Sequence, residues 1–112
     1  MKLFSALRGI REFERLHLPL LKSMLDFDLV IEIGYAEEQA QPLTLKQLLL
    51  LNLSSRTTVR RKLEGLIERG IVRRRKSARD QRSSILGISS SGYKSLAKYS
   101  AGLKKLCAEV ED

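Results

Sequence analysis

The feature that most constrains this fold is a short helical segment followed by an abrupt break, just before the middle of the chain. Thr44 can cap a helix that runs from Leu45 to about Leu51, because its hydroxyl accepts a hydrogen bond from an otherwise unpaired first-turn amide. Asn52-Leu53-Ser54 then interrupts the helical pattern. The segment is too short to fold by itself, so it needs a second element to pack against.

The residues after the break predict that second element. Ser54 or Ser55 can cap a helix near residues 55–69, and Gly70 ends it as a glycine at a helix C-terminus does. The residues expected to point inward follow helical spacing: Val59, Leu63, Leu66 and Ile67. A short helix, a tight turn and a second helix together predict a helix-turn-helix.

A β-hairpin is expected directly after Gly70. Residues 71–76 read IVRRRK and residues 84–89 read SILGIS, and the polar-basic loop SARDQRS separates them. The β-favouring residues on both flanks predict antiparallel pairing, although alternation in the first flank is weak. A hairpin that follows a helix-turn-helix is a wing, here near residues 73–88.

Helices are predicted on both sides of this core. The first covers residues 2–16, the second 19–39 with Pro19 in its first turn, and the last runs from a Ser90 or Ser91 cap to about Val110. Their expected apolar stripes are Leu3, Leu7, Ile10 and Phe13; Leu20, Met24, Phe27, Ile31 and Tyr35; and Leu96, Leu103, Leu106 and Val110. The predicted fold is mainly α with a small β-hairpin wing (α+β), a winged helix-turn-helix with flanking N- and C-terminal helices.

The positive charge is concentrated in one stretch. The 112 residues carry a formal net charge of +8, and the segment from Arg56 to Arg82 holds eleven Lys or Arg against three acids, so the rest of the chain is neutral overall. Such a concentration indicates a polyanion partner, because each cation placed on a phosphate releases counterions. The alternative is a basic surface that serves solubility, which gives no reason for the clustering.

The outward face of the second motif helix has the chemistry of a major-groove reader. Arginine bonds bidentately to guanine, and threonine offers a hydroxyl together with a methyl group for thymine. We expect base contacts from Arg56, Thr57, Arg60 and Arg61, and phosphate contacts from Ser55 and Thr58. The alternative is that these are merely solvated positions of an amphipathic helix.

The predicted wing is also basic. Its expected DNA-binding residues are Arg73, Arg74, Arg75, Lys76, Arg79, Asp80 and Arg82. An arginine on a hairpin tip can enter a narrow minor groove, where the negative potential is high. Asp80 either holds the guanidinium of Arg82 or forms the turn by bonding to its own backbone, and the sequence favours neither.

The segment from Leu43 to Gly92 resembles the DNA-binding core of the multiple-antibiotic-resistance regulator (MarR) family of winged-helix transcription factors. The resemblance covers about 50 of the 112 residues. It rests on Leu43-Thr44, Thr58-Val59, Leu66 four residues before Gly70, Asp80-x-Arg82, and the Ser89-to-Gly92 turn. The resemblance implies that Arg82 reaches the minor groove with Asp80 supporting it. Typical members are longer and end in two helices, whereas this chain has room for one.

These observations predict a sequence-specific transcriptional regulator, more often a repressor in the family it resembles, that binds double-stranded DNA at a pseudo-palindromic site as a homodimer. We expect a single domain over 1–112, with a DNA-binding core at 43–89 and dimerisation through 1–40 and 90–112. The alternative is a winged-helix architectural or adaptor module that binds nucleic acid non-specifically or a protein partner. A small-molecule effector is possible, and its identity is not readable.

Enzymatic chemistry finds little support. The acids are scattered, and no glycine-rich phosphate loop is present. With one Cys no intramolecular disulfide can form, and one His and one Cys nearly exclude a Cys/His metal site, so no cofactor is expected. Cys107 is expected to be a buried small hydrophobe rather than a reactive thiol, and His17 a structural residue rather than a pH sensor. With no signal-peptide or membrane-spanning pattern, a cytoplasmic, nucleoid-associated protein is expected.

Overall fold

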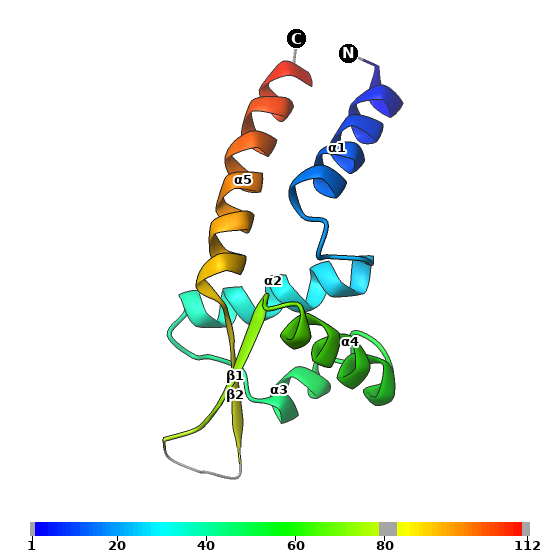
Figure 1. Ribbon diagram of the computed structural model, residues 1–112. Coiled ribbons are helices and arrows are strands. Elements are labelled where there is room, and N and C mark those ends of the chain that lie inside the picture. The colour runs from blue at the N-terminus through cyan, green and yellow to red at the C-terminus, as the bar shows by residue number, and fades with distance from the viewer. Residues whose placement is uncertain (1, 79–82, 111–112) are drawn as a thin grey trace. The chain divides into compact units, whose positions relative to one another are not determined.

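The computed structural model describes residues 2–78 and 83–110 (Figure 1). Its side chains are described as far as Ala108. Its elements are α1 (Leu3–His17), α2 (Met24–Glu38), α3 (Leu45–Leu50), α4 (Arg56–Glu68), β1 (Val72–Lys76), β2 (Ser84–Ile88) and α5 (Ser90–Val110). The predicted fold class, mainly helical with one antiparallel hairpin, is confirmed. None of the described helices is both long and apolar enough to cross a membrane.

The chain divides into two compact units. One unit comprises Leu20–Gly92, and the other joins the segment up to Pro19 with the segment from Tyr93 onward. The first unit therefore contains the helix-turn-helix and the hairpin, and the second contains α1 and most of α5. The organisation of 1–112 as one domain with dimerisation segments at both ends stays a prediction.

The helix-turn-helix forms where its local signals predict it. The Thr44 hydroxyl accepts from the Gln47 amide at 3.1 Å, and the Gln47 side chain accepts from the Thr44 amide at 2.9 Å, which completes a capping box at α3. Asn52 turns the chain with φ of 54°, and Ser55 rather than Ser54 caps α4. Gly70 leaves α4 with φ of 77°, a conformation that glycine adopts without steric cost.

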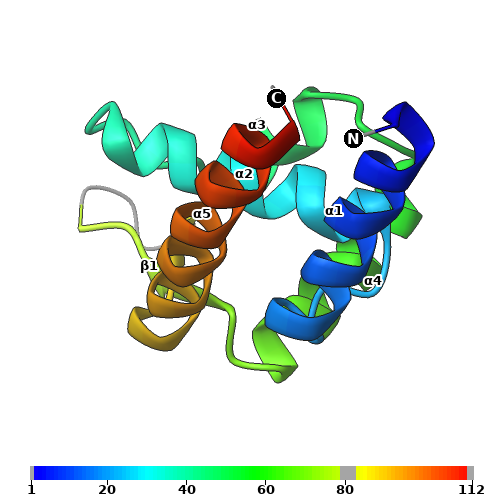
Figure 2. The ribbon, with the colours of Figure 1, turned by 90° about the horizontal axis from the view of Figure 1, so that it is seen from above.

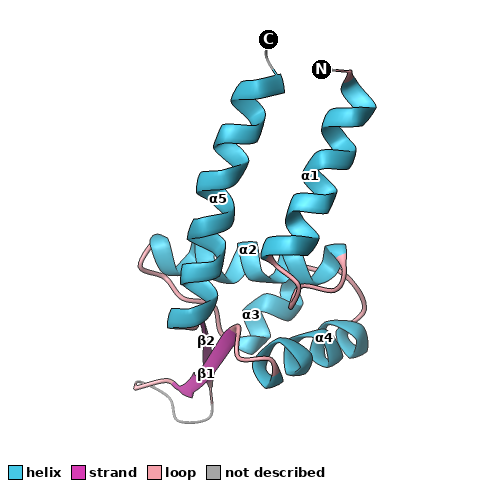
Figure 3. Ribbon diagram, turned by 45° about the horizontal axis from the view of Figure 1, so that its top comes forward, coloured by secondary structure: helices cyan, strands magenta, loops and turns pink. Residues whose placement is uncertain are grey.

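The hairpin is anchored through the outer edge of β2. β1 pairs antiparallel with β2 in a register that sets Val72 opposite Ile88 and Arg73 opposite Gly87. The outer edge of β2 is partly covered, because the Leu86 amide donates to the Leu43 carbonyl at 2.9 Å. Figure 3 shows the two strands as the only sheet of the described chain. This backbone bond anchors the hairpin to the segment that leads into α3.

The core of the Leu20–Gly92 unit draws side chains from α2, α3, α4 and β2. Its fully buried apolar side chains are Leu29, Val30, Ile33, Leu48, Val59, Leu63, Leu66 and Leu86. The inward positions predicted for α4 are thus confirmed, except that Ile67 is only half-buried. Because α4 and β2 share one core with α2, their positions depend on one another.

The sequence prediction for α2 is wrong in both its start and its face. The helix begins at Met24 under a Ser23 cap, and Pro19 lies in a turn before it. Val30 and Ile33 are buried, whereas Met24, Ile31 and Tyr35 of the predicted stripe are exposed, as is Leu20 ahead of the helix. The buried face of α2 carries polar residues at both ends, so its sequence pattern is that of a solvent-facing surface.

The second unit packs α1 against α5 (Figure 2). The rings of Phe13 and Tyr99 lie 5.7 Å apart between centroids, and the Tyr99 hydroxyl donates to Glu14 at 3.3 Å. Burial and the nearby Glu14 carboxylate raise the pKa of Tyr99 to about 12. Gly102 leaves space for the Phe13 ring, since a Cβ on residue 102 would lie 2.1 Å from that ring.

Two predictions for α5 are wrong. The helix begins at Ser90, and the hydroxyl of Ser89, not of Ser90 or Ser91, accepts from the Gly92 amide at 2.9 Å. Cys107 is exposed rather than buried, because Leu103 and Leu106 take the half-buried positions on their side of the helix. Val110, the last residue of the predicted stripe, has no described side chain.

Candidate nucleic-acid interface

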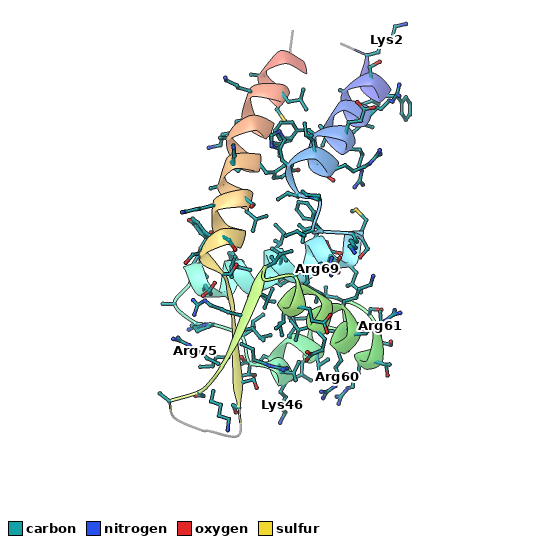
Figure 4. The ribbon with its side chains drawn as sticks, viewed as in Figure 1. Lys2, Lys46, Arg60, Arg61, Arg69 and Arg75 are labelled. Carbon is teal, nitrogen blue, oxygen red and sulfur yellow. The ribbon has the colours of Figure 1, made fainter. Side chains whose placement is uncertain are left out.

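The outward face of α4 carries the predicted base-reading residues in an accessible state. Arg56, Thr57, Arg60 and Arg61 are all exposed, and their charged side chains make no ion pair within the described part of the chain. Figure 4 shows Arg60 and Arg61 extending from α4 away from the core. These guanidinium groups are therefore available to a partner without breaking an existing contact.

Ser55 and Thr58 have a local structural duty as well. The Ser55 hydroxyl donates to Thr58 Oγ1 at 2.8 Å and accepts from the Thr58 amide at 3.2 Å. This cap aligns the first turn of α4, whose free amides and partial positive charge attract an anion. Both residues lie at the end of the helix where a phosphate would find these donors.

Lys46 is a candidate that the sequence analysis missed. It is exposed in the first turn of α3, and Figure 4 shows it projecting on the same side as Arg60 and toward the end where the hairpin extends. The available signal was the place of Lys46 at the start of the first motif helix, the helix that crosses the DNA backbone in a helix-turn-helix complex. Lys46 of α3 therefore extends the exposed basic surface that Arg56, Arg60 and Arg61 form on α4.

The wing cations fall into two groups. Arg73 donates through Nη2 to Glu37 at 3.1 Å and through Nε to the Ile88 carbonyl at 3.2 Å, and Arg74 pairs with Glu64 of α4 at 2.9 Å. Arg75 and Lys76 are exposed, and among the described residues neither has an ion-pair partner. Arg79, Asp80 and Arg82 lie outside the described residues, so their roles stay predictions.

A metal site and the single histidine are also candidates for a functional feature. They contain no group of three or more His, Cys, Asp or Glu side chains placed to hold a metal ion. The His17 ring packs on Phe13 with centroids 4.1 Å apart, which is a packing contact.

No protein-family model and no curated protein sequence matches this chain. Solved structures do. A crystal structure of MarR matches with a TM-score of 0.63 at 20% identity, covering 96% of this chain and 73% of MarR. The fold is that of the MarR-type winged-helix regulators. The resemblance stated from the sequence is confirmed at the level of the fold.

Two further MarR-type structures extend the comparison. The S. aureus MepR–DNA complex matches with a TM-score of 0.69 at 19% identity, covering 94% of this chain and 81% of MepR. The transcriptional regulator BldR from Sulfolobus solfataricus matches with a TM-score of 0.60 at 24% identity, covering 91% of this chain and 70% of BldR. The MarR-type fold is thus matched along nearly the whole chain.

Proposed function

We propose that this chain is a sequence-specific DNA-binding transcriptional regulator, a repressor that binds a pseudo-palindromic site as a homodimer. The observation that carries the proposal is the exposed Arg/Thr face of α4, whose cations have no ion-pair partners among the described residues. Unpaired arginines on a helix of this width match the donor pattern that the major groove reads. A DNA complex of the similarly folded MepR adds support.

The contacts divide by chemistry. Arg56, Thr57, Arg60 and Arg61 read base edges, while Ser55, Thr58 and Lys46 bind phosphate. The wing contributes Arg75, Lys76 and Arg79 directly, and Arg82 reaches the adjacent minor groove with Asp80 supporting it. Arg74 joins them by exchanging its half-exposed ion pair with Glu64 for a phosphate, since such pairs contribute little stability.

A second copy of the chain is the partner proposed for α1. Leu3, Phe4 and Leu16 of this helix have exposed fractions of 66%, 79% and 75%, which is unusual for so many large apolar side chains on one helix. We infer a twofold dimer that buries them and so presents two copies of α4 to one DNA site, whose half-sites lie about one helical turn apart. Two-fold symmetry of the protein then requires an inverted repeat in the DNA.

The test is selection of duplexes from a random pool by the purified protein, followed by anisotropy titration at two salt concentrations. We expect an inverted repeat that is bound far more tightly than bulk DNA. Arg60→Ala should lose discrimination at one base position by about 1–3 kcal/mol, whereas Lys46→Ala should weaken all duplexes alike. Arg15→Ala, an exposed arginine of α1, removes the same charge and serves as control.

Three results would contradict the proposal. Salt-sensitive binding without an enriched motif would favour a non-specific architectural protein, and no binding at low salt would leave a protein adaptor. Equal loss on all duplexes for Arg60→Ala would also remove the base-reading role from α4.

A further inference from the structure

Two acidic residues on one face of α2 bind the two elements that are candidates for contacting DNA, the hairpin and α4. Asp26 and Glu37 are eleven positions apart, which places them about 16 Å apart along the helix axis and within about 20° of the same face. Between them on that face lie the buried Val30 and Ile33. The face that α2 turns toward the core therefore begins and ends with a carboxylate.

The Glu37 end holds the wing. Glu37 Oε1 accepts from the Ile88 amide at 2.8 Å, and Oε2 accepts from Arg73 Nη2 at 3.1 Å. Arg73 also donates through Nε to the Ile88 carbonyl at 3.2 Å. One carboxylate thus contacts both strands of the hairpin, at its base, and satisfies an outward amide of β2 that the sheet leaves unpaired.

The Asp26 end holds α4. Asp26 is completely buried, and its Oδ2 lies 3.4 Å from Arg69 Nη1 and accepts from the Lys22 amide at 2.9 Å. Arg69, the residue that closes α4, also donates to the carbonyls of Gly65 and Leu20. The C-terminal end of α4 is therefore tied to the start of α2.

A glycine makes room for the arginine at each end. A Cβ at Gly87 would lie 2.7 Å from Glu37 Oε2 and 3.1 Å from Arg73 Cζ, and a Cβ at Gly65 would lie 2.9 Å from Arg69 Nη2. Gly87 faces Arg73 directly across the hairpin, so the guanidinium lies over it. Both ion pairs thus occupy space that any larger residue would fill.

We propose that Glu37 and Asp26 are positioning residues for DNA recognition: from one rigid helix they set the wing and the recognition helix relative to each other. This inference rests on the proposed function. It assigns Arg73 and Arg69 to their ion pairs with Glu37 and Asp26 rather than to DNA. The charge of Arg73 alone had suggested a DNA contact. A site that needs major-groove and minor-groove contacts at once depends on this spacing, whereas non-specific phosphate binding does not.

The test compares Glu37→Gln with Glu38→Gln, which removes the same charge from the neighbouring exposed position. Each is titrated against the duplex recovered by selection and against a shuffled duplex of equal length. We expect Glu37→Gln to weaken the selected duplex about fivefold and to leave the shuffled one unchanged, while Glu38→Gln changes neither. Hydroxyl-radical footprints should show the lost protection in the minor groove flanking each half-site.

Arg73→Gln and the Glu37→Gln/Arg73→Gln double variant complete the experiment. If Arg73 acts through Glu37, the double variant loses no more than either single variant. The inference is overturned if Glu37→Gln behaves like Glu38→Gln, or if Arg73→Gln weakens both duplexes equally and adds to Glu37→Gln, as a direct phosphate contact would. Failure to select any duplex with the wild-type protein refutes the proposed function itself, which separates the two failures.

Discussion

Replacing Gly65 by alanine sets two opposite effects against each other in one helix. Gly65 lies inside α4, where alanine is favoured over glycine by about 1 kcal/mol of helix propensity. The new Cβ, however, would lie 2.9 Å from Arg69 Nη2 and force the guanidinium to move. The sign of the change in the free energy of unfolding therefore shows whether the contacts of the Arg69 guanidinium contribute more stability than the gain in helix propensity.

The contribution can be bounded from the contacts of Asp26. This carboxylate is fully buried, and within the described residues only Arg69 and the Lys22 amide contact its oxygens. Removing the partner of a buried charge costs about 3–5 kcal/mol, and displacing a flexible guanidinium that is 19% exposed removes only part of that, about 2–3 kcal/mol. After the gain in propensity, Gly65→Ala should destabilise the protein by about 1–2 kcal/mol.

Urea unfolding and calorimetry measure this, with Gly9→Ala as the matched control. Gly9 lies inside α1, and a Cβ there meets nothing within 4 Å, so its substitution should stabilise by about 0.5–1 kcal/mol. In an Arg69→Met background, Gly65→Ala should also stabilise. If Gly65→Ala stabilises the wild-type protein as much as Gly9→Ala does, the Arg69–Asp26 contact contributes nothing and the reasoning is wrong.

Three further outcomes are expected. The stabilisation from keeping Tyr99 protonated is complete below pH 10 and is lost as pH rises toward about 12, so Tyr99→Phe should flatten the fall in melting temperature over that window. An equally steep fall in the variant would assign the alkaline transition to other groups. Thr44→Ala should cost about 1 kcal/mol in urea unfolding, because both bonds of the capping box are lost, and a neutral result would deny the box a role. Lys46→Ala should lower the salt slope of DNA binding by about 1 per protomer in a titration over sodium chloride, and an unchanged slope would place Lys46 off the phosphates.

The helix-turn-helix and the hairpin could be predicted because their signals are local. Thr44, Ser55 and Gly70 act within one turn of their own positions, and each performs the capping or terminating role expected of its residue type. The exposed face of α4 followed from the same periodicity. Where a side chain's role depends on its neighbours in the chain, the sequence was a sufficient guide.

The face of α2 could not be predicted, for a physical reason. Asp26 and Glu37 occupy the buried face because each meets an arginine from a distant segment, 43 and 36 positions away. When those arginines are not known, a helix face with two acids is expected to face solvent. The apolar stripe of Met24, Ile31 and Tyr35 was therefore predicted to be buried, although all three are exposed. The prediction that Cys107 is buried was wrong for a similar reason, because the exposure of a residue on α5 depends on what the helix packs against.

The same long-range pairing changes how the basic segment from Arg56 to Arg82 should be interpreted. Its net charge counts every arginine alike, but Arg69 and Arg73 are held by carboxylates of α2. Cations that already have such partners release no counterions when DNA binds, whereas exposed ones such as Arg60 do. Arg69→Met should therefore leave the salt slope of binding unchanged even where it lowers stability, and charge concentration alone overstates the size of the DNA contact.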